Sequence, residues 1–203
     1  MLLFTRRNMF QSTAFLLSAV DNVKMVSWRE ALDIIDSQTP FAFRAAVCSS
    51  GSFLYRGETI DAPQVLQPSP DLLLAGTYDD KEALRYFTCL EGRLENSGAK
   101  PSTGHIGTSK YEDAASWGPV ASIWPLGTEI SYVWPQNAAT FYPESSCVTD
   151  YTVDRDLGIA LRLGREVLFV SRFGDDNRSS SFLAIPSRYD AELQASLSFC
   201  HQS

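Results

Sequence analysis

Three short segments of the sequence place a polar side chain at the end of an apolar run, where a sheet-built cleft would collect it. The first ends in Arg56 and Gly57, the second carries Thr108 and Ser109, and the third opens with Glu166. A guanidinium offers a planar fork of donors to phosphate, and a following glycine lets a ligand approach the backbone. The first segment is therefore a candidate phosphate clamp.

Each of the three segments also has a purely structural interpretation. Arg56 can pair with Glu58, as strand-end arginines commonly do with a nearby acid. Ser109 can cap a helix, with Glu112 three residues later completing a capping box. A carboxylate at the start of an apolar strand, such as Glu166, either faces water at the rim or is held in a cleft by partners.

The order of the segments resembles the R-S-E class of ADP-ribosyltransferases, whose motifs are an aromatic-Arg-Gly strand end, a Ser-Thr-Ser segment before a helix and a Glu-leading strand. Here the motifs read LYRG at residues 54–57, GTS at 107–109 and GRE at 164–166, at even intervals. The resemblance covers roughly residues 53–185. Because each motif is short, its order and context supply most of the specificity.

Two positions depart from the family pattern. Gly107 replaces the first serine of Ser-Thr-Ser and removes a hydroxyl that would help orient the glutamate, so Thr108 or Ser109 would have to compensate. Gly164 stands where enzymes that modify arginine usually carry Glu or Gln. The resemblance therefore disfavours arginine as the acceptor.

The resemblance implies NAD as the substrate and Arg56, Ser109 and Glu166 as the catalytic residues. Arg56, with Gly57, would hold the pyrophosphate or the nicotinamide ribose side. Thr108 and Ser109 would support the nicotinamide mononucleotide half. Glu166 would hydrogen-bond the ribose 2′-hydroxyl and stabilise the oxocarbenium-like charge as nicotinamide leaves.

Aromatic side chains are expected to line such a pocket. Tyr111, Trp117 and Tyr132 are candidates for stacking on nicotinamide or adenine, although most aromatic residues of the chain are expected in the core. His105 is a candidate contact to the adenosine ribose, and its alternative is a partly exposed loop histidine.

The leading functional prediction is a mono-ADP-ribosyltransferase that transfers ADP-ribose to a macromolecular acceptor other than arginine, with a protein expected. Its acceptor-recognition loop is expected at residues 141–155. The alternatives are an NAD glycohydrolase and a non-catalytic binding or structural domain of the same fold. A third alternative, an RNA 2′-phosphotransferase of related fold, needs more basic residues and histidines than this chain has.

Composition narrows the partners. The chain of 203 residues carries 24 acidic and 17 basic side chains, and the net charge of −7 disfavours general binding to nucleic acid or anionic lipid. Four scattered cysteines and two histidines have no metal-ligand spacing, so no metal is expected. Two disulfides are possible by count, but buried, reduced thiols are the expectation.

Residues 1–20 combine the twin arginine Arg6-Arg7 with a short, interrupted apolar run. This pattern is similar to an export signal, yet it is too short to span a bilayer. A helix packed on the domain, in a cytoplasmic protein, is the expectation, with export as the alternative.

The elements that must position the motifs follow from periodicity and from turn residues. Helices are expected at 27–39, 41–47, 79–94, 111–117 and 190–199, and residues 155–163 fit a helix or the approach to a strand. Strands are expected at 53–57, around 123–142 and at 166–170, the last forming a hairpin with 182–185. We predict one α+β domain, in which a helical segment (1–52) packs on a split, mostly antiparallel sheet of ADP-ribosyltransferase type (53–203).

Overall fold

The computed structural model describes residues 22–67, 81–94, 104–141, 150–171 and 181–197. Within these residues the chain is α+β, as expected, with six α-helices and an open antiparallel sheet of nine strands. The helices are α2 (Trp28–Gln38), α3 (Phe41–Ser50), α5 (Lys81–Leu94), α6 (Tyr111–Ala115), α7 (Leu157–Arg162) and α8 (Asp190–Ser196). A short 3-10 helix, η4 (Ser187–Tyr189), leads into α8.

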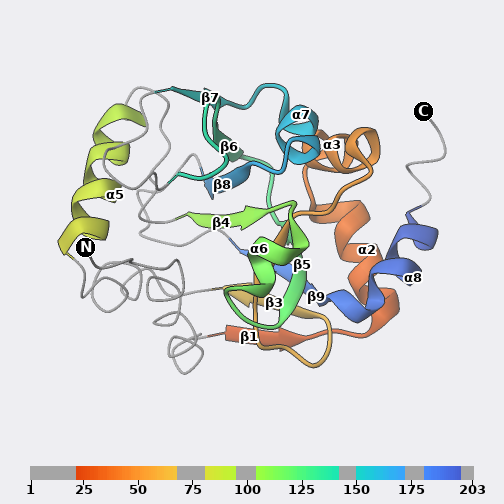
Figure 1. Cartoon of the computed structure of the whole chain (residues 1–203). Coiled ribbons are helices and arrows are strands. Elements are labelled where there is room, and N and C mark those ends of the chain that lie inside the picture. The colour runs from red at the N-terminus through yellow and green to blue at the C-terminus, as the bar shows by residue number, and fades with distance from the viewer. Residues whose placement is uncertain (1–21, 68–80, 95–103, 142–149, 172–180, 198–203) are drawn as a thin grey trace.

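The sheet runs in the order β1-β3-β9-β5-β2-β4-β8-β6-β7, so β2, β4 and β8 are inner strands (Figure 1). The strands are β1 (Asn22–Met25), β2 (Tyr55–Gly57), β3 (Gln64–Gln67), β4 (His105–Thr108), β5 (Val120–Pro125), β6 (Ile130–Pro135), β7 (Tyr151–Val153), β8 (Glu166–Ser171) and β9 (Phe182–Pro186). Segments far apart in the chain therefore meet in the middle of the sheet.

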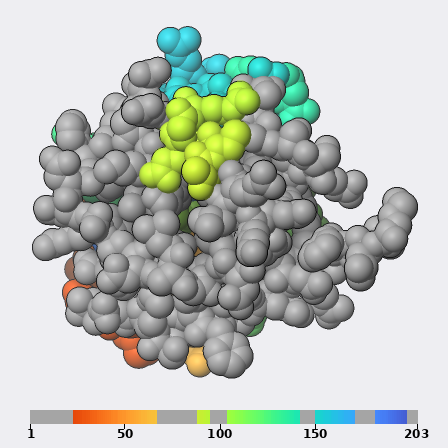
Figure 2. All heavy atoms as spheres, turned by 90° about the vertical axis from the view of Figure 1, so that its left-hand side faces the viewer, coloured from red at the N-terminus to blue at the C-terminus, as the bar shows by residue number. Residues whose placement is uncertain are grey.

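Helices cover the sheet from two sides, and a separate cluster of buried apolar residues lies under the helices on each side. In Figure 1, α2, α3, α7 and α8 gather on the right and α5 stands alone on the left. The larger cluster joins the right-hand helices to the sheet, with Phe43 of α3 against Trp124 and Tyr132. The smaller cluster includes Leu90 and Leu94 of α5, whose C-terminal end stands out on this face in Figure 2.

Helix α2 begins and ends as its sequence predicts. The Ser27 hydroxyl accepts a hydrogen bond from the Glu30 amide at 3.2 Å, which satisfies one of the free donors at the start of α2. Helix α2 ends at Gln38, just before Thr39 and Pro40. Residues 157–162, left open between helix and strand, form α7.

The expected strand pairing and the expected state of the cysteines are wrong. β8 and β9 do not form a hairpin, because β8 pairs with β4 and β6 whereas β9 pairs with β3 and β5. A continuous apolar run identifies each strand but carries no information on which partner the strand takes. The reduced state expected of the cysteines is also wrong for Cys48 and Cys89, which are both disulfide-bonded.

The structure leaves one expectation untested and adds two strands that were not expected. Residues 1–20, with the export-like pattern, lie outside the described part of the chain. Strands β1 and β3, which the sequence reading missed, pair with each other at one edge of the sheet. In the described ranges, no helix has the length and apolar character needed to cross a membrane.

Candidate functional site

The three motifs lie on three adjacent strands. Tyr55 of β2 is opposite Thr108 of β4, and Thr108 is opposite Glu166 of β8. Directly opposed residues of antiparallel strands project from the same face, so these three form one row, the motif row. Arg56 follows Tyr55 in the strand and leaves from the other face. The sheet therefore gathers the motifs but directs Arg56 and Glu166 away from each other.

Arg56 is held by Glu58, which stands two residues later, just past the end of β2. Its Nε lies 2.7 Å from Oε1 of Glu58, with only 19% and 14% of the two side chains exposed. A second guanidinium nitrogen donates to the Ile106 carbonyl oxygen at 3.3 Å. Burial raises the pKa of Glu58, and the charge and hydrogen bond of Arg56 act in the opposite direction. The structural interpretation of Arg56, as a partner of Glu58, is confirmed.

Glu166 is buried, with 6% of its surface exposed, so the interpretation as a rim carboxylate is wrong. Its Oε2 accepts a hydrogen bond from the Phe141 amide at 2.7 Å. Its own amide donates to the Ala139 carbonyl at 2.8 Å. The segment that leaves β6 therefore crosses the start of β8 and holds the carboxylate in place. This segment begins the expected acceptor loop at 141–155, of which residues 142–149 lie outside the described part.

The hydroxyls of the second motif also have partners within the protein. Thr108 is fully buried, and its Oγ1 accepts from the Lys110 amide at 3.1 Å. The Ser109 hydroxyl donates to the Leu161 carbonyl of α7. Helix α6 starts at Tyr111 with Lys110 at its N-cap, so the prediction that Ser109 caps this helix is wrong. Ser109 instead fastens the end of β4 to α7.

The local structure explains both glycines that depart from the family pattern. A Cβ added to Gly107 would lie 2.7 Å from Leu54 Cγ and 2.9 Å from Ile123 Cδ1, inside the core, so a serine does not fit without a shift. Gly164 has φ of +66°, a conformation that disfavours Glu or Gln. It sits in the tight connection from α7 to β8, where its amide bonds the Leu161 carbonyl.

Two of the proposed ligand contacts belong to the core. His105 is 2% exposed on β4, with its ring 5.3 Å from that of Phe169 and 4.8 Å from that of Phe182. The alternative of an exposed loop histidine is therefore wrong. Tyr132 is 4% exposed and stacks on Phe43 at 5.8 Å, which leaves it no face for a ligand.

Gly57 and Trp117 meet one another. A Cβ added to Gly57 would lie 2.6 Å from the Trp117 carbonyl carbon and 2.7 Å from the Gly118 amide nitrogen. The segment that follows α6 therefore packs against the end of β2 at Trp117.

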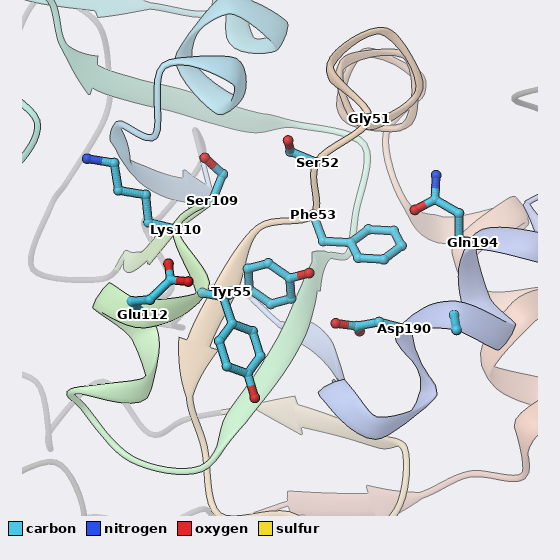
Figure 3. Close-up of a pocket in the computed structure, with 11 residues that line it drawn as sticks. Gly51, Ser52, Phe53, Tyr55, Ser109, Lys110, Glu112, Asp190 and Gln194 are labelled. Atoms are coloured by element: carbon cyan, nitrogen blue, oxygen red, sulfur yellow. The ribbon is translucent and has the colours of Figure 1, made fainter.

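A cavity of about 750 Å³ lies beside the motif row, between the α3–β2 connection, the start of α6 and α8 (Figure 3). Three aromatic side chains line it: Phe53, Tyr55 and Tyr111. The Tyr55 ring meets both others edge to face, with centroids 6.2 Å from Phe53 and 5.6 Å from Tyr111. Of the residues that the sequence nominates for NAD, Ser109 and Tyr111 line this cavity, whereas Arg56 and Glu166 do not.

The charged groups of the cavity are Lys110, Glu112 and Asp190. Asp190, at the start of α8, points toward Tyr55 and forms a hydrogen bond with its hydroxyl (Figure 3). Burial raises the pKa of Asp190 to about 6, and the bond from Tyr55 opposes this shift. Burial also raises the pKa of Tyr55, and the negative charge of Asp190 adds to the rise, so the phenol stays protonated and donates.

Sequence reasoning missed the pair of Tyr55 and Asp190. Asp190 is the first residue of the expected C-terminal helix, and nothing in its neighbourhood distinguishes it from an acid at a helix start. Tyr55 had appeared only as the aromatic position of the first motif. In the described ranges, no group of His, Cys, Asp and Glu is arranged to hold a metal ion.

Comparison with known proteins adds no relative: no protein-family model, no curated protein and no solved structure matches this chain.

Proposed function

We propose that this protein binds NAD and cleaves its nicotinamide–ribose bond, as a mono-ADP-ribosyltransferase with an acceptor other than arginine. The observation that carries the proposal is that three motifs, spread over more than a hundred residues of the chain, lie on the adjacent strands β2, β4 and β8. Chance motif matches would have no reason to meet on three adjacent strands of a nine-stranded sheet. The split sheet of ADP-ribosyltransferase type is part of this proposal.

The chemistry assigns one task to each motif. Arg56 binds the pyrophosphate, and this requires that it exchange part of its contact with Glu58 for phosphate oxygens. Thr108 and Ser109 support the nicotinamide ribose. Glu166 accepts a hydrogen bond from the ribose 2′-hydroxyl and stabilises the positive charge on C1′ as the C1′–N bond breaks. Nicotinamide leaves with the bonding electron pair.

A nucleophile of the acceptor then attacks C1′ and loses a proton. We propose a protein acceptor, recognised at residues 141–155, because this segment begins at the Phe141 amide that binds Glu166. Where water is the nucleophile, the same steps give NAD hydrolysis.

Nicotinamide release from NAD tests the proposal, with the wild type compared with Glu166→Gln. Glutamine is the sharper choice than alanine because its carbonyl oxygen can still accept from the Phe141 amide, so the buried bond survives while the charge is lost. Glu129→Gln is the matched control, since it removes one exposed carboxylate from the β5–β6 turn. We expect release to fall on the order of a hundredfold in Glu166→Gln and to be unchanged in Glu129→Gln.

Full release by a folded Glu166→Gln protein would contradict the role of this carboxylate. Circular dichroism and thermal unfolding of each variant establish that it is folded. Assays with and without a cell lysate separate transfer from hydrolysis, because only transfer requires an acceptor.

One observation favours a second candidate function, a domain that binds without turnover. Arg56 and Glu166 are each engaged by protein partners, and Gly107 leaves no room for the serine that the family uses. This candidate predicts that NAD shifts the melting temperature but that no nicotinamide is released. Calorimetry and the release assay together distinguish the two functions.

The disulfide bonds of Cys48 and Cys89 bear on where the protein works. Disulfides persist in oxidising compartments and are rare in the cytosol. We therefore propose export, the alternative suggested by residues 1–20, over a cytoplasmic location. Mass spectrometry of protein alkylated without prior reduction checks this in the native host: modified Cys48 or Cys89 would contradict export.

A further inference from the structure

We propose that the cavity between α3, α6 and α8 binds a planar organic cation of the guanidinium type. This cavity contains neither Arg56 nor Glu166, and the proposal therefore does not depend on NAD cleavage. Its walls supply a carboxylate on one side and aromatic rings in the middle.

The charged side chains around the cavity favour a positively charged ligand. Asp190 and Glu112 line the cavity with one opposing cation, Lys110, and the whole chain carries a net charge of −7. Within the described residues the Asp190 Oδ1 atom is buried and has no hydrogen-bond donor, while the carboxylate also accepts from Tyr55. A partly buried carboxylate gains more from a charged donor than from a neutral one, because such hydrogen bonds are about twice as strong.

The aromatic rings select the shape of the ligand. Tyr55 lies between Phe53 and Tyr111 in two edge-to-face contacts, and 46% of Tyr111 is exposed. Ring faces attract cations, and a guanidinium is planar and weakly hydrated, so it stacks on a ring more readily than a compact ammonium does. Its fork of donors also matches a carboxylate in two parallel hydrogen bonds. Carboxylate and rings therefore favour the same ligand class.

Polar groups at the rim of the cavity add hydrogen-bonding capacity. Ser52 lies above Phe53 in Figure 3, and Gln194 of α8 extends from the opposite wall. A volume of about 750 Å³ exceeds that of a guanidinium alone and accommodates an alkyl stem behind it. The site thus fits an alkylguanidinium, free or carried by a larger molecule.

Calorimetric titration of the full-length protein with butylguanidinium and with butylurea tests the inference. The two compounds have the same shape and differ in charge. We expect butylguanidinium to bind with one-to-one stoichiometry and at least about tenfold more tightly than butylurea, as expected when a charged hydrogen bond is present in one and absent in the other. Equal affinities would overturn the proposal, as would the absence of binding by butylguanidinium.

The variant Asp190→Asn locates the binding. Asparagine keeps the size of the side chain and can still accept from the Tyr55 hydroxyl, so the fold is expected to persist. We expect about a tenfold loss of butylguanidinium affinity in Asp190→Asn and no change in Asp33→Asn, which removes an exposed carboxylate from α2. An equal loss in both variants would reduce the effect to net charge and overturn the assignment.

The NAD assay is run in parallel on the same proteins. Loss of nicotinamide release in Glu166→Gln with unchanged butylguanidinium binding would support both proposals as separate sites. Binding of butylguanidinium by a protein that never releases nicotinamide would contradict the proposed function and support the cation site. Displacement of butylguanidinium by NAD in proportion to NAD occupancy would show a single NAD site and overturn the inference.

Discussion

The motif row and the neighbouring cavity share the ends of β2 and β4 but treat their polar groups in opposite ways. In and around the row, protein partners already satisfy the charges: Arg56 is paired with Glu58, and Glu166 with the Phe141 amide. In the cavity, Asp190 keeps a buried oxygen without a donor among the described residues, and Tyr111 is nearly half exposed. A ligand must displace protein contacts at the row, whereas at the cavity it can add contacts.

The two regions are therefore expected to respond differently to substitution: the row in its stability and the cavity in its ligand binding. Substitutions in and around the row remove or crowd contacts on which the fold depends, so they are expected to lower the free energy of unfolding. Substitutions in the cavity are expected to affect ligand binding while the fold is unchanged or more stable. Four substitutions test the comparison.

The largest effect is expected from Arg56→Ala. Its removal leaves Glu58 buried without its partner, and breaking a buried pair in this way costs about 3–5 kcal/mol of unfolding free energy. Urea denaturation measures the loss. The double variant Arg56→Met/Glu58→Leu is expected to recover most of it, because no uncompensated charge remains. A loss below about 1 kcal/mol in Arg56→Ala would show that the pair is screened by water.

A smaller loss is expected from Gly107→Ser, which restores the serine of the family pattern. The new side chain would press on Leu54 and Ile123 in the core, and overpacking of this kind costs about 1–3 kcal/mol. Gly92→Ser in α5 is the matched control, since nothing lies within 4 Å of its added Cβ. If Gly107→Ser unfolds at the same denaturant concentration as wild type, the row is looser than its contacts indicate.

Ser109→Ala is expected to cost about 1 kcal/mol, because the Leu161 carbonyl loses a hydrogen-bond donor. This residue belongs to both regions, since it ends β4 and also lines the cavity. Ser116→Ala, which removes an exposed hydroxyl bond to the Asp113 carbonyl, is expected to change the unfolding free energy by less than half as much. Thermal unfolding of the two variants side by side measures the difference.

The smallest effect, and the only one of opposite sign, is expected from Asp190→Asn. The pKa of Asp190 is raised from 3.8 to about 6, so the folded state holds a proton that the unfolded chain releases between these values. The stability contributed by the protonated form is present below pH 4 and is lost as the pH rises to about 6. Asparagine carries no such loss, so the variant is expected to be more stable than wild type at pH 7.

Near pH 4 the advantage of Asp190→Asn is expected to vanish. Because the side chain is partly exposed, water screens the effect and keeps it small. Melting temperatures across pH 4–7 measure it, with Asp33→Asn as the control. A variant less stable than wild type at pH 7 would show that charged Asp190 has a compensating partner.

Most elements of the fold were predictable because their signals are local. The Ser27 cap, the stop at Thr39 and Pro40 and the apolar run that starts at Glu166 each determine structure within a few residues. Strand pairing was not predictable in the same way. Nothing within β8 or β9 states that their partners lie elsewhere, since pairing depends on contacts that close long loops.

The same distinction between local and long-range signals applies to the candidate site. The sequence by itself determined the residue types and the order of the three motifs, and it raised Glu58 as a partner for Arg56 because the two stand two residues apart in the chain. The tertiary structure alone decided that Glu166 is buried under the Phe141 amide, that Gly107 has no room for a side chain and that Asp190 meets Tyr55 across a cavity. Spacing along a chain specifies contacts within one turn or strand. Burial and long-range hydrogen bonds depend on which surfaces the whole sheet brings together.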